Sequence, residues 1–301
     1  MLSFKPISIA DKDAITACTY PSRFLNCDFA FANMCSWRFL YDSEFAVVDG
    51  FLLIRFLIEE KGRKHQVYMF PVGNGDFRHI IAVLEDDARA NGHPLWILGV
   101  TPDEKKTLNQ LFPSEFIYIV ERDYFDYIYL RSDLQQLKGK KYQAKRNHIN
   151  KFRDNYRYTS LPLTPDLAPK CMELECKWYR DNHTEEDAED LEHEHRSIAF
   201  ALNHFRELDL LGCALCVEGE IIAFTYGSPI NRYTFGVHVE KADIRYEGVF
   251  SVINREFVSC LPEQFLYINR EEDLGISGLR RSKLSYHPVI LLEKNTAVKR
   301  R

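Results

Sequence analysis

The order of elements predicted between residues 210 and 288 limits the fold more than any other feature of the chain. Two apolar, β-rich runs, Leu210–Val217 and Glu220–Ser228, are separated by Glu218-Gly219, which is typical of a tight hairpin. A third strand, Tyr233–Glu240, is followed by a glycine turn, a helix, a strand, a helix and a strand. This order predicts an α+β domain with a mixed, mostly antiparallel sheet flanked by helices.

Alternation in the third strand predicts which side chains share a face. Phe235, Val237 and Val239 are two residues apart and are expected on one face of the strand. His238 is expected on the opposite face, where we predict a hydrogen-bonded structural histidine rather than a base.

The turn that follows this strand predicts an anion site. In segment 245–250, Arg-Tyr-Glu-Gly-Val-Phe, Gly248 allows close backbone approach, and Val249, Ile253 and Phe257 have helical spacing. The free N–H groups at the start of a helix attract phosphate, so this turn suits a pyrophosphate. A plain strand-to-helix turn has the same sequence pattern, and both interpretations stay open at this point.

The composition fits a chain with two hydrophobic cores. The 301 residues are 46% hydrophobic and 28% charged, and no apolar run approaches the roughly 20 residues of a membrane span. Residues 1–5 lack the apolar core of a signal peptide, which predicts a cytoplasmic protein without a transmembrane segment. The eight cysteines have no framework spacing, and His193 and His195 cannot share a helical face, so neither disulfides nor a metal site is expected.

The same order of elements is predicted twice along the chain. The first half is expected to contain helices Ala10–Cys18, Phe29–Trp37, Asp76–Asn91 and Pro102–Leu111, and strands Phe45–Val48, Phe51–Ile58, Gln66–Phe70, Leu95–Gly99, Phe116–Val120 and Tyr127–Leu130. The second half is expected to begin with helices Pro165–Tyr179 and Ala188–Glu207. The predicted domains are therefore residues 1–132 and 133–301, and the active site is expected in the second.

A basic segment lies just after the predicted boundary. Segment 138–157 contains eight basic residues and a single acid, Asp154. Its apolar residues have helical spacing, while Lys141, Lys145 and His148 share another face, which predicts one amphipathic helix that bridges the two halves. An anion-binding helix and an ordinary solvated helix both have this pattern. No recognised DNA-binding motif accompanies it, so a DNA partner is not expected.

Two segments carry a family resemblance. Segment 137–152 is Leu-Lys-Gly-Lys-Lys-Tyr-x-x-Lys-Arg-Asn-His-Ile-Asn-Lys-Phe, and segment 267–288 contains Tyr-Ile-Asn-Arg-Glu-Glu-Asp-Leu-Gly and Lys-Leu-Ser-Tyr-x-Pro. They resemble the catalytic C-terminal domain of phosphatidylglycerol lysyltransferase and its soluble, stand-alone bacterial relatives, almost end to end. Those proteins are similar to the Fem peptidyltransferases. The resemblance therefore implies two tandem GNAT-like acyltransferase domains and transfer of an acyl or aminoacyl group to an amine or hydroxyl.

The resemblance also implies a donor and the residues that bind it. The donor is expected to be a coenzyme A thioester or an aminoacyl-tRNA, with no permanently bound cofactor, so tRNA is a possible partner. The acceptor is expected to be a small molecule, a lipid or a peptide, and the oligomeric state stays open. Donor binding is expected from Val239, Arg245, Tyr246, Glu247, Gly248, Val249, Phe250, Asn254 and Asn269. Lys141, Lys145 and Arg146 resemble the interdomain basic residues with which Fem enzymes hold phosphorylated ligands, and are expected to bind substrate.

Chemical reasoning adds candidate catalytic residues. Acyl transfer needs a base for the acceptor and a stabiliser for the tetrahedral oxyanion, whereas an enzyme nucleophile is not compulsory. Glu271, Glu272 and Asp273 suit a base or a ligand for an acceptor ammonium, Lys283 suits the oxyanion or a phosphate, and Tyr286 suits a proton donor. Each also has a structural interpretation, namely a charged turn, an exposed helix lysine and a core tyrosine.

Two departures from the family patterns support an alternative function. Phe250 stands where the GNAT phosphate-binding loop has a small residue, and Ser285 replaces the second lysine of a lysyltransferase motif. These changes favour a non-catalytic ligand-binding protein that keeps the GNAT fold. The polar cluster in segment 270–288 favours the transferase instead.

Overall fold

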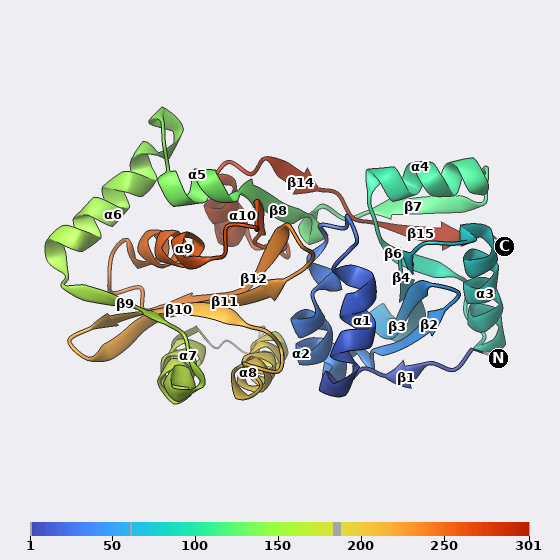
Figure 1. The fold of residues 1–301 in the computed structure, drawn as a ribbon, viewed down its shortest axis with the longest axis horizontal. Helices are drawn as coiled ribbons and strands as arrows, with labels where there is room; N and C mark the ends of the chain where they lie inside the picture. Colours follow the sequence, from blue (N-terminus) through green and yellow to red (C-terminus); the bar gives the residue numbers. More distant parts are fainter. Residues whose placement is uncertain (1, 61, 183–187, 301) are drawn as a thin grey trace.

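Two mixed β-sheets lie end to end in the computed structural model, which describes residues 2–60, 62–182 and 188–300 (Figure 1). The strand order of the first sheet is β1-β2-β3-β4-β6-β15-β7, with β5 paired to β3, and only its β4–β6 pair is parallel. Its strands are β1 (Lys5–Pro6), β2 (Glu44–Val48), β3 (Phe51–Glu60), β4 (Arg63–Met69), β5 (Val72–Gly73), β6 (Trp96–Val100), β7 (Phe116–Val120) and β15 (Asn295–Lys299). Its helices are α1 (Lys12–Thr19), α2 (Phe31–Tyr41), α3 (Phe77–Ala90) and α4 (Pro102–Leu111).

The second sheet has the order β14-β8-β13-β12-β11-β10-β9, and its β12–β13 pair is parallel. Its strands are β8 (Asp126–Leu130), β9 (Tyr158–Pro162), β10 (Leu211–Val217), β11 (Glu220–Pro229), β12 (Thr234–Ala242), β13 (Tyr267–Asn269) and β14 (Ile290–Leu292). Its helices are α5 (Arg131–Gln136), α6 (Gln143–Asn155), α7 (Ala168–Asn182), α8 (Ala188–Asn203), α9 (Val249–Cys260) and α10 (Ser277–Leu284). Figure 1 shows α7 and α8 on one face of this sheet and α6 and α9 on the other.

The two sheets exchange strands across the predicted boundary at residue 132. Strand β8 precedes this boundary but pairs with β13 and β14 of the second sheet. Strand β15, at the end of the chain, pairs with β6 and β7 of the first sheet. The chain therefore crosses between the sheets twice, and residues distant in sequence meet where it crosses.

The predicted α+β class with two mixed, helix-flanked sheets is confirmed, and two local predictions need correction. The basic segment does not form one helix, because Leu137 and Gly139 have φ of 48° and 88° and separate α5 from α6. Strand β9 was not predicted, since its residues are short of apolar side chains. It pairs with β10 and forms the edge of the second sheet.

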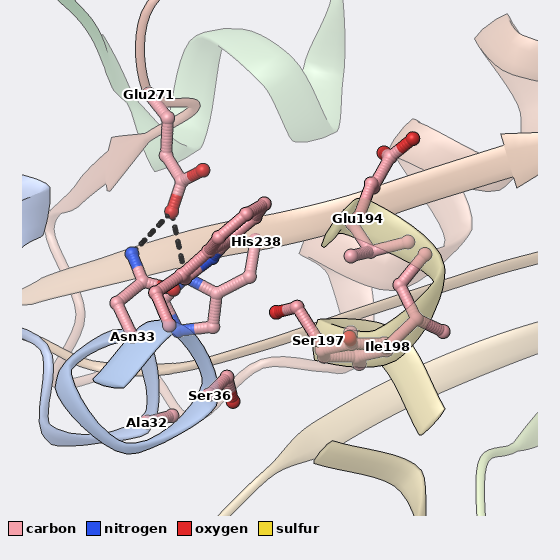
Figure 2. A pocket seen from close by; sticks show the side chains of 11 residues that line it. Ala32, Asn33, Ser36, Glu194, Ser197, Ile198, His238 and Glu271 are labelled. Carbon is pink, nitrogen blue, oxygen red and sulfur yellow. Dashed lines mark hydrogen bonds and ion pairs between the residues drawn. The ribbon is translucent and has the colours of Figure 1, made fainter. Parts of the chain in front are cut away.

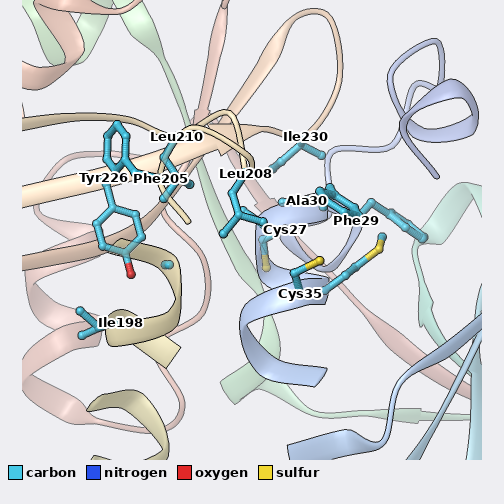
Figure 3. Packing of buried hydrophobic residues seen from close by; sticks show 14 of the residues in the cluster. Cys27, Phe29, Ala30, Cys35, Ile198, Phe205, Leu208, Leu210, Tyr226 and Ile230 are labelled. Carbon is cyan, nitrogen blue, oxygen red and sulfur yellow. The ribbon is translucent and has the colours of Figure 1, made fainter. Parts of the chain in front are cut away.

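A shared hydrophobic core joins the two halves of the chain (Figure 3). Cys27, Phe29 and Cys35, in or beside α2, belong to one buried cluster with Ile198 of α8 and Tyr226 of β11. A second cluster fills the α6–α9 face of the second sheet, and a third lies beneath α3 and α4 of the first. The shared cluster fixes α2 of the first half against the second sheet. Among the described residues, no helix is long and apolar enough to cross a membrane.

Candidate functional site

The parallel strands β12 and β13 separate after only three paired positions. Thr234–Gly236 pairs with Tyr267–Asn269. Strand β12 then continues to Ala242, whereas β13 ends at Asn269 and the segment after it turns away. Backbone groups beyond the last pair are released from the ladder, and the side chains that follow face each other across the opening. This divergence places His238 opposite Glu271.

A β-bulge at His238 changes the faces of β12. Tyr226 of β11 pairs with Val239, whereas the next residue, Gly227, pairs with Val237, so His238 has no partner in the register. The predicted common face of Phe235, Val237 and Val239 is therefore wrong. Phe235 and Val237 pack in the α9-side cluster, but Val239 packs against the cluster shared with α2 and α8. One extra residue reverses the alternation from that point on.

His238 and Glu271 form the centre of the first polar group at the opening (Figure 2). The Nδ1 atom of His238 lies 2.7 Å from Oε1 of Glu271, and its Nε2 atom lies 2.7 Å from Oγ of Ser228. Asn33 of α2 donates from Nδ2 to the same Glu271 oxygen at 2.7 Å. Glu271 has a φ of 57°, which is uncommon for a residue with a side chain. Both halves of the chain thus hold this carboxylate in place.

A small pocket surrounds this pair between α2, α8, β11 and β12. It is lined by Ala32, Asn33, Ser36, Trp37, Glu194, Ser197, Ile198, Tyr226, His238, Val239 and Glu271. Of the predicted site residues, Glu271 and Val239 lie here. The other polar lining residues were missed, because Asn33, Glu194 and Tyr226 come from distant parts of the chain and no local motif marks them.

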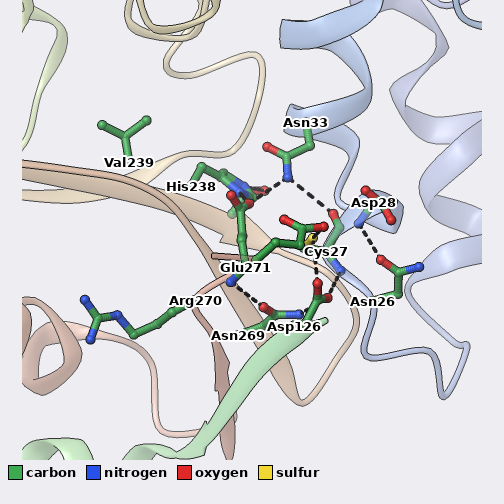
Figure 4. A network of polar contacts seen from close by, with 12 residues as sticks. Asn26, Cys27, Asp28, Asn33, Asp126, His238, Val239, Asn269, Arg270 and Glu271 are labelled. Carbon is green, nitrogen blue, oxygen red and sulfur yellow. Dashed lines mark hydrogen bonds and ion pairs between the residues drawn. The ribbon is translucent and has the colours of Figure 1, made fainter. Parts of the chain in front are cut away.

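A second polar group lies on the α9 side of the opening. Arg270 is buried, donates from Nη2 to Oε1 of Glu240 at 3.0 Å, and its guanidinium carbon lies 4.9 Å from the ring centre of Tyr286. Nζ of Lys145 lies 3.8 Å from the same ring centre. Asn254 donates weakly to Glu240, at 3.4 Å. Figure 4 shows Arg270 extending away from the His238–Glu271 pair.

This second group has unsatisfied hydrogen-bonding capacity. Nη1 of Arg270 and Oδ1 of Asn254 are buried, and neither has a hydrogen-bond partner within the described residues. Burial, and then the positive charge of Arg270, lowers the pKa of Lys145 to about 8. Beside these two adjacent cations, the described residues place one carboxylate, that of Glu240, which favours an anion or a carbonyl oxygen in this space.

The side chains of Lys283 and Asp273 are buried, and both make hydrogen bonds within the protein. Lys283 is buried, and its Nζ donates to the carbonyl oxygens of Arg270, at 2.5 Å, and of Glu272. Burial lowers the pKa of Lys283, and the nearby Arg270 adds to the effect. The exposed-lysine interpretation is therefore wrong. Burial disfavours ionised Asp273, but hydrogen bonds from Arg280 and Tyr127 outweigh it and lower the pKa of this carboxyl.

Glu272 belongs to a cluster around the buried Lys294. Figure 4 labels three other members of this cluster, Cys27, Asp28 and Asp126. Nζ of Lys294 lies 2.8 Å from Asp126 and 3.2 Å from Asp28, and it also contacts Glu272 and the thiol of Cys27. Cys27, Asp28 and Glu272 are close enough to hold a metal ion. The ammonium of Lys294 already supplies the positive charge between these carboxylates. Asn269 is also engaged here, since it donates to Asp126 and to a carbonyl of the first half.

The turn before α9 packs against α6. Gly248 has a φ of 90°, and a Cβ atom there would lie 2.5 Å from the carbonyl oxygen of His148. The close approach that the glycine allows is therefore to another helix of the same chain. Arg245 is exposed and pairs with Asp243 at 2.6 Å. The remaining predicted donor residues of this turn are placed as follows: the ring of Tyr246 contacts Tyr156 edge to face, Glu247 pairs with Lys151, Val249 is buried and Phe250 is exposed.

Replacing Gly248 by alanine is expected to destabilise the protein. A positive φ is unfavourable for alanine, and the added carbon would push the turn away from His148, at a combined cost of about 1–3 kcal/mol. Urea unfolding monitored by circular dichroism measures this loss. Gly278→Ala is the control, because a Cβ atom at Gly278 meets no neighbour. Equal stability of the two variants would contradict the packing role of Gly248.

Of the three predicted substrate-binding residues, Lys145 points into the second polar group. Lys141 lies 3.4 Å from Asp133, and Arg146 donates to the carbonyl of Gly139 at 2.8 Å and to that of Leu137. Arg146 therefore holds the turn between α5 and α6. Tyr286, a predicted catalytic residue, is buried between Lys145 and Arg270, which places it beside the opening.

Comparisons with known proteins agree with this fold. A conserved protein of unknown function from Bacteroides thetaiotaomicron is 50% identical, with full coverage of both chains and a TM-score of 0.95. The structure of L-PGS from Bacillus licheniformis is 14% identical over 98% of this chain and 93% of its own, with a TM-score of 0.67. FemX is 9% identical over 98% and 97%, with a TM-score of 0.61. The search of curated proteins found no match.

The similarities to L-PGS and to FemX concern the fold alone, because these sequence identities are low. A family model describes the sequence itself over residues 22–298, nearly the whole chain. The matched region includes both polar groups at the β12–β13 opening and the Lys294 cluster. The chain belongs to the family of the C-terminal region of phosphatidylglycerol lysyltransferase.

Proposed function

We propose that the protein transfers an acyl or aminoacyl group from a phosphate-bearing carrier to an amine or hydroxyl. The observation that carries this proposal is the opening between β12 and β13, which has a carboxylate–histidine pair on one side and two cations on the other. Family membership and the Fem-like fold support the transferase chemistry. The candidate donors are coenzyme A thioesters and aminoacyl-tRNA, both cytoplasmic, which is where we place the protein.

The two sides of the opening take different roles in this proposal. Lys145 and the unpartnered Nη1 of Arg270 bind a phosphate or polarise the acyl carbonyl. Glu271, held by His238 and Asn33, accepts the proton of the acceptor. Tyr286 positions both cations through its ring. We assign this machinery to the domain of residues 133–301, with α2 of residues 1–132 forming one wall of the acceptor side.

The decisive experiment measures product formation with labelled donors. The purified protein is incubated with acetyl coenzyme A or with a mixture of charged tRNAs, together with amine and hydroxyl acceptors, and labelled product is separated from donor. Transfer above the uncatalysed rate from either donor class supports the proposal. Donor binding without transfer would instead support the alternative, a ligand-binding protein that keeps the fold and lacks the reaction.

Donor binding is expected to depend on Lys145, on salt and on pH. Lys145→Gln should weaken binding about 10–100-fold, because it removes a charged hydrogen-bond donor from the anion site. Since the pKa of Lys145 is about 8, wild-type affinity should fall as pH rises through 8, while Lys145→Arg keeps its charge and its affinity. Higher salt should weaken wild-type binding.

Calorimetric titration with acetyl coenzyme A and with tRNA measures these effects. Lys151→Gln is the matched control, because Lys151 lies on the same helix, is exposed and pairs only with Glu247 among the described residues. If Lys145→Gln binds both donors as tightly as Lys151→Gln does at low salt, Lys145 has no role in donor binding.

A further inference from the structure

Carboxylate, hydroxyl, amide and aromatic side chains line the pocket beside Glu271. Its lining includes the carboxylates of Glu194 and Glu271 and the ring of Trp37, and the described residues contribute neither lysine nor arginine to it. Its cavity volume of about 40 Å³ is room for about three water-sized groups. A narrow, polar end of a ligand fits this space, while a coenzyme or a nucleotide does not.

Three largely buried residues of this lining carry hydroxyl groups. Tyr226 is 2% exposed, and Ser36 and Ser197 are each 5% exposed. Among the described residues, none lies in hydrogen-bond contact with any of these three hydroxyls, although all three residues line the pocket. These hydroxyls are not among the fully buried, unpartnered atoms, so they reach the accessible space of the pocket. Their convergence on one cavity offers hydrogen bonds to a ligand that displaces water from it.

The two carboxylates also retain free capacity. Glu194 uses Oε2 to pair with Lys241 at 2.7 Å, and Glu271 uses Oε1 for both His238 and Asn33. Within the described part of the chain, the second oxygen of each carboxylate has no hydrogen-bond partner. Burial, and then the charges of Glu194 and Glu271, raises the pKa of the Tyr226 phenol well above its ordinary value. The cavity is therefore electronegative.

We infer that this pocket binds the primary ammonium group of the acceptor, so that the product is an amide. This inference rests on the proposed transferase function and names its acceptor class. An ammonium group has three N–H donors and a positive charge, which match carboxylate oxygens, hydroxyls and an aromatic ring. A phosphate-bearing acceptor would instead meet two carboxylates, of which only Glu194 is paired with a lysine or arginine, Lys241, among the described residues.

The proposed transfer needs no reactant other than the acyl donor and the amine acceptor. Glu271 takes a proton from the ammonium, and the neutral nitrogen attacks the acyl carbon across the β12–β13 opening. The new C–N bond forms as the C–S bond of a thioester or the C–O bond of an aminoacyl ester breaks. The nitrogen loses a second proton as this bond forms. One of the two protons goes to the departing thiolate or ribose oxygen and the other to solvent, which leaves Glu271 ionised for the next turnover.

Binding of small probes tests the inference without any donor. The probes are 1,5-diaminopentane, its neutral analogue 1,5-pentanediol, and glycerol 3-phosphate, titrated into the full chain and followed by calorimetry or ligand-observed NMR. The diamine is expected to bind at least about tenfold more tightly than the other two. Tyr226→Phe with Ser197→Ala should weaken diamine binding about tenfold and leave the melting temperature unchanged, because the described residues make no hydrogen bond to the lost hydroxyls.

Tyr233→Phe is the control, since it removes the hydroxyl of an exposed tyrosine outside the pocket. Diol or glycerol 3-phosphate binding as tight as that of the diamine would overturn the inference, and so would unchanged diamine affinity in the double variant. Transfer assays separate this result from the proposed function. Diamine binding without any transfer keeps the ammonium pocket and removes the transferase, whereas transfer to hydroxyl acceptors alone keeps the transferase and removes the pocket's role.

Discussion

Replacing Glu271 by glutamine is expected to lower kcat/KM for acyl transfer by a factor of about 10²–10⁴, the usual contribution of a positioned general base. The fold should survive, because the amide oxygen of glutamine can still accept the hydrogen bonds from His238 and Asn33 that Oε1 accepts now. The measurement is kcat/KM with the donor and acceptor that the product assay identifies. A melting curve of the same preparation checks that the variant is folded.

Glu263→Gln is the matched control, because Glu263 is exposed and carries the same substitution outside the site. Its kcat/KM should equal that of the wild type. If Glu271→Gln retains full activity, the base is another group and the carboxylate has a structural role. If the wild type and the Glu271→Gln variant both lack activity, the ligand-binding alternative is favoured over catalysis.

Replacing Lys294 by methionine is expected to cost about 3–5 kcal/mol of unfolding free energy, because it leaves buried carboxylates without their counter-charge. Asp126 is fully buried and lies 2.8 Å from Nζ of Lys294, and Glu272 is in contact with the same atom. Chemical denaturation at pH 7 measures the loss. The variant's deficit should shrink at lower pH, since carboxylates that lack the ammonium have raised pKa values and become neutral by binding protons.

Lys106→Met provides the comparison for this prediction. Lys106 pairs with Asp103 at 3.0 Å on the exposed surface of α4. An exposed pair contributes about 0.2–1 kcal/mol, so this variant should be nearly as stable as the wild type. A Lys294→Met variant as stable as Lys106→Met would show that the cluster tolerates the loss, for example by protonation of Glu272, whose pKa burial already raises.

Local features of the fold could be predicted from the sequence because local interactions determine them. Helix α4 has the predicted bounds, since the fixed φ of Pro102 suits the first position of a helix. The hairpin at Glu218-Gly219 forms as predicted, and both residues have positive φ, as a two-residue turn requires. Helix α9 begins at Val249, where the spacing of its apolar residues predicted it.

The candidate site was predictable only in part. The sequence marked the segment that contains Arg270, Glu271 and Lys283 as chemically unusual, since charged residues follow a buried strand. It did not indicate that Lys283 would be buried on backbone carbonyls, nor that Asn33 would reach Glu271 across more than two hundred residues. Nor did it reveal the bulge at His238, because a bulge depends on the register with β11 rather than on β12 alone.

The sequence by itself determined the class of most elements, their order along the chain and the family, because periodicity, turn residues and motifs are properties of short stretches of chain. Only the tertiary structure decided that β8 and β15 exchange sheets and that α2 closes the pocket beside Glu271. It also decided which charged groups are neutralised and which keep free hydrogen-bonding capacity. The physical reason is that burial and electrostatic pairing depend on the distances between side chains far apart in sequence, and packing alone sets those distances.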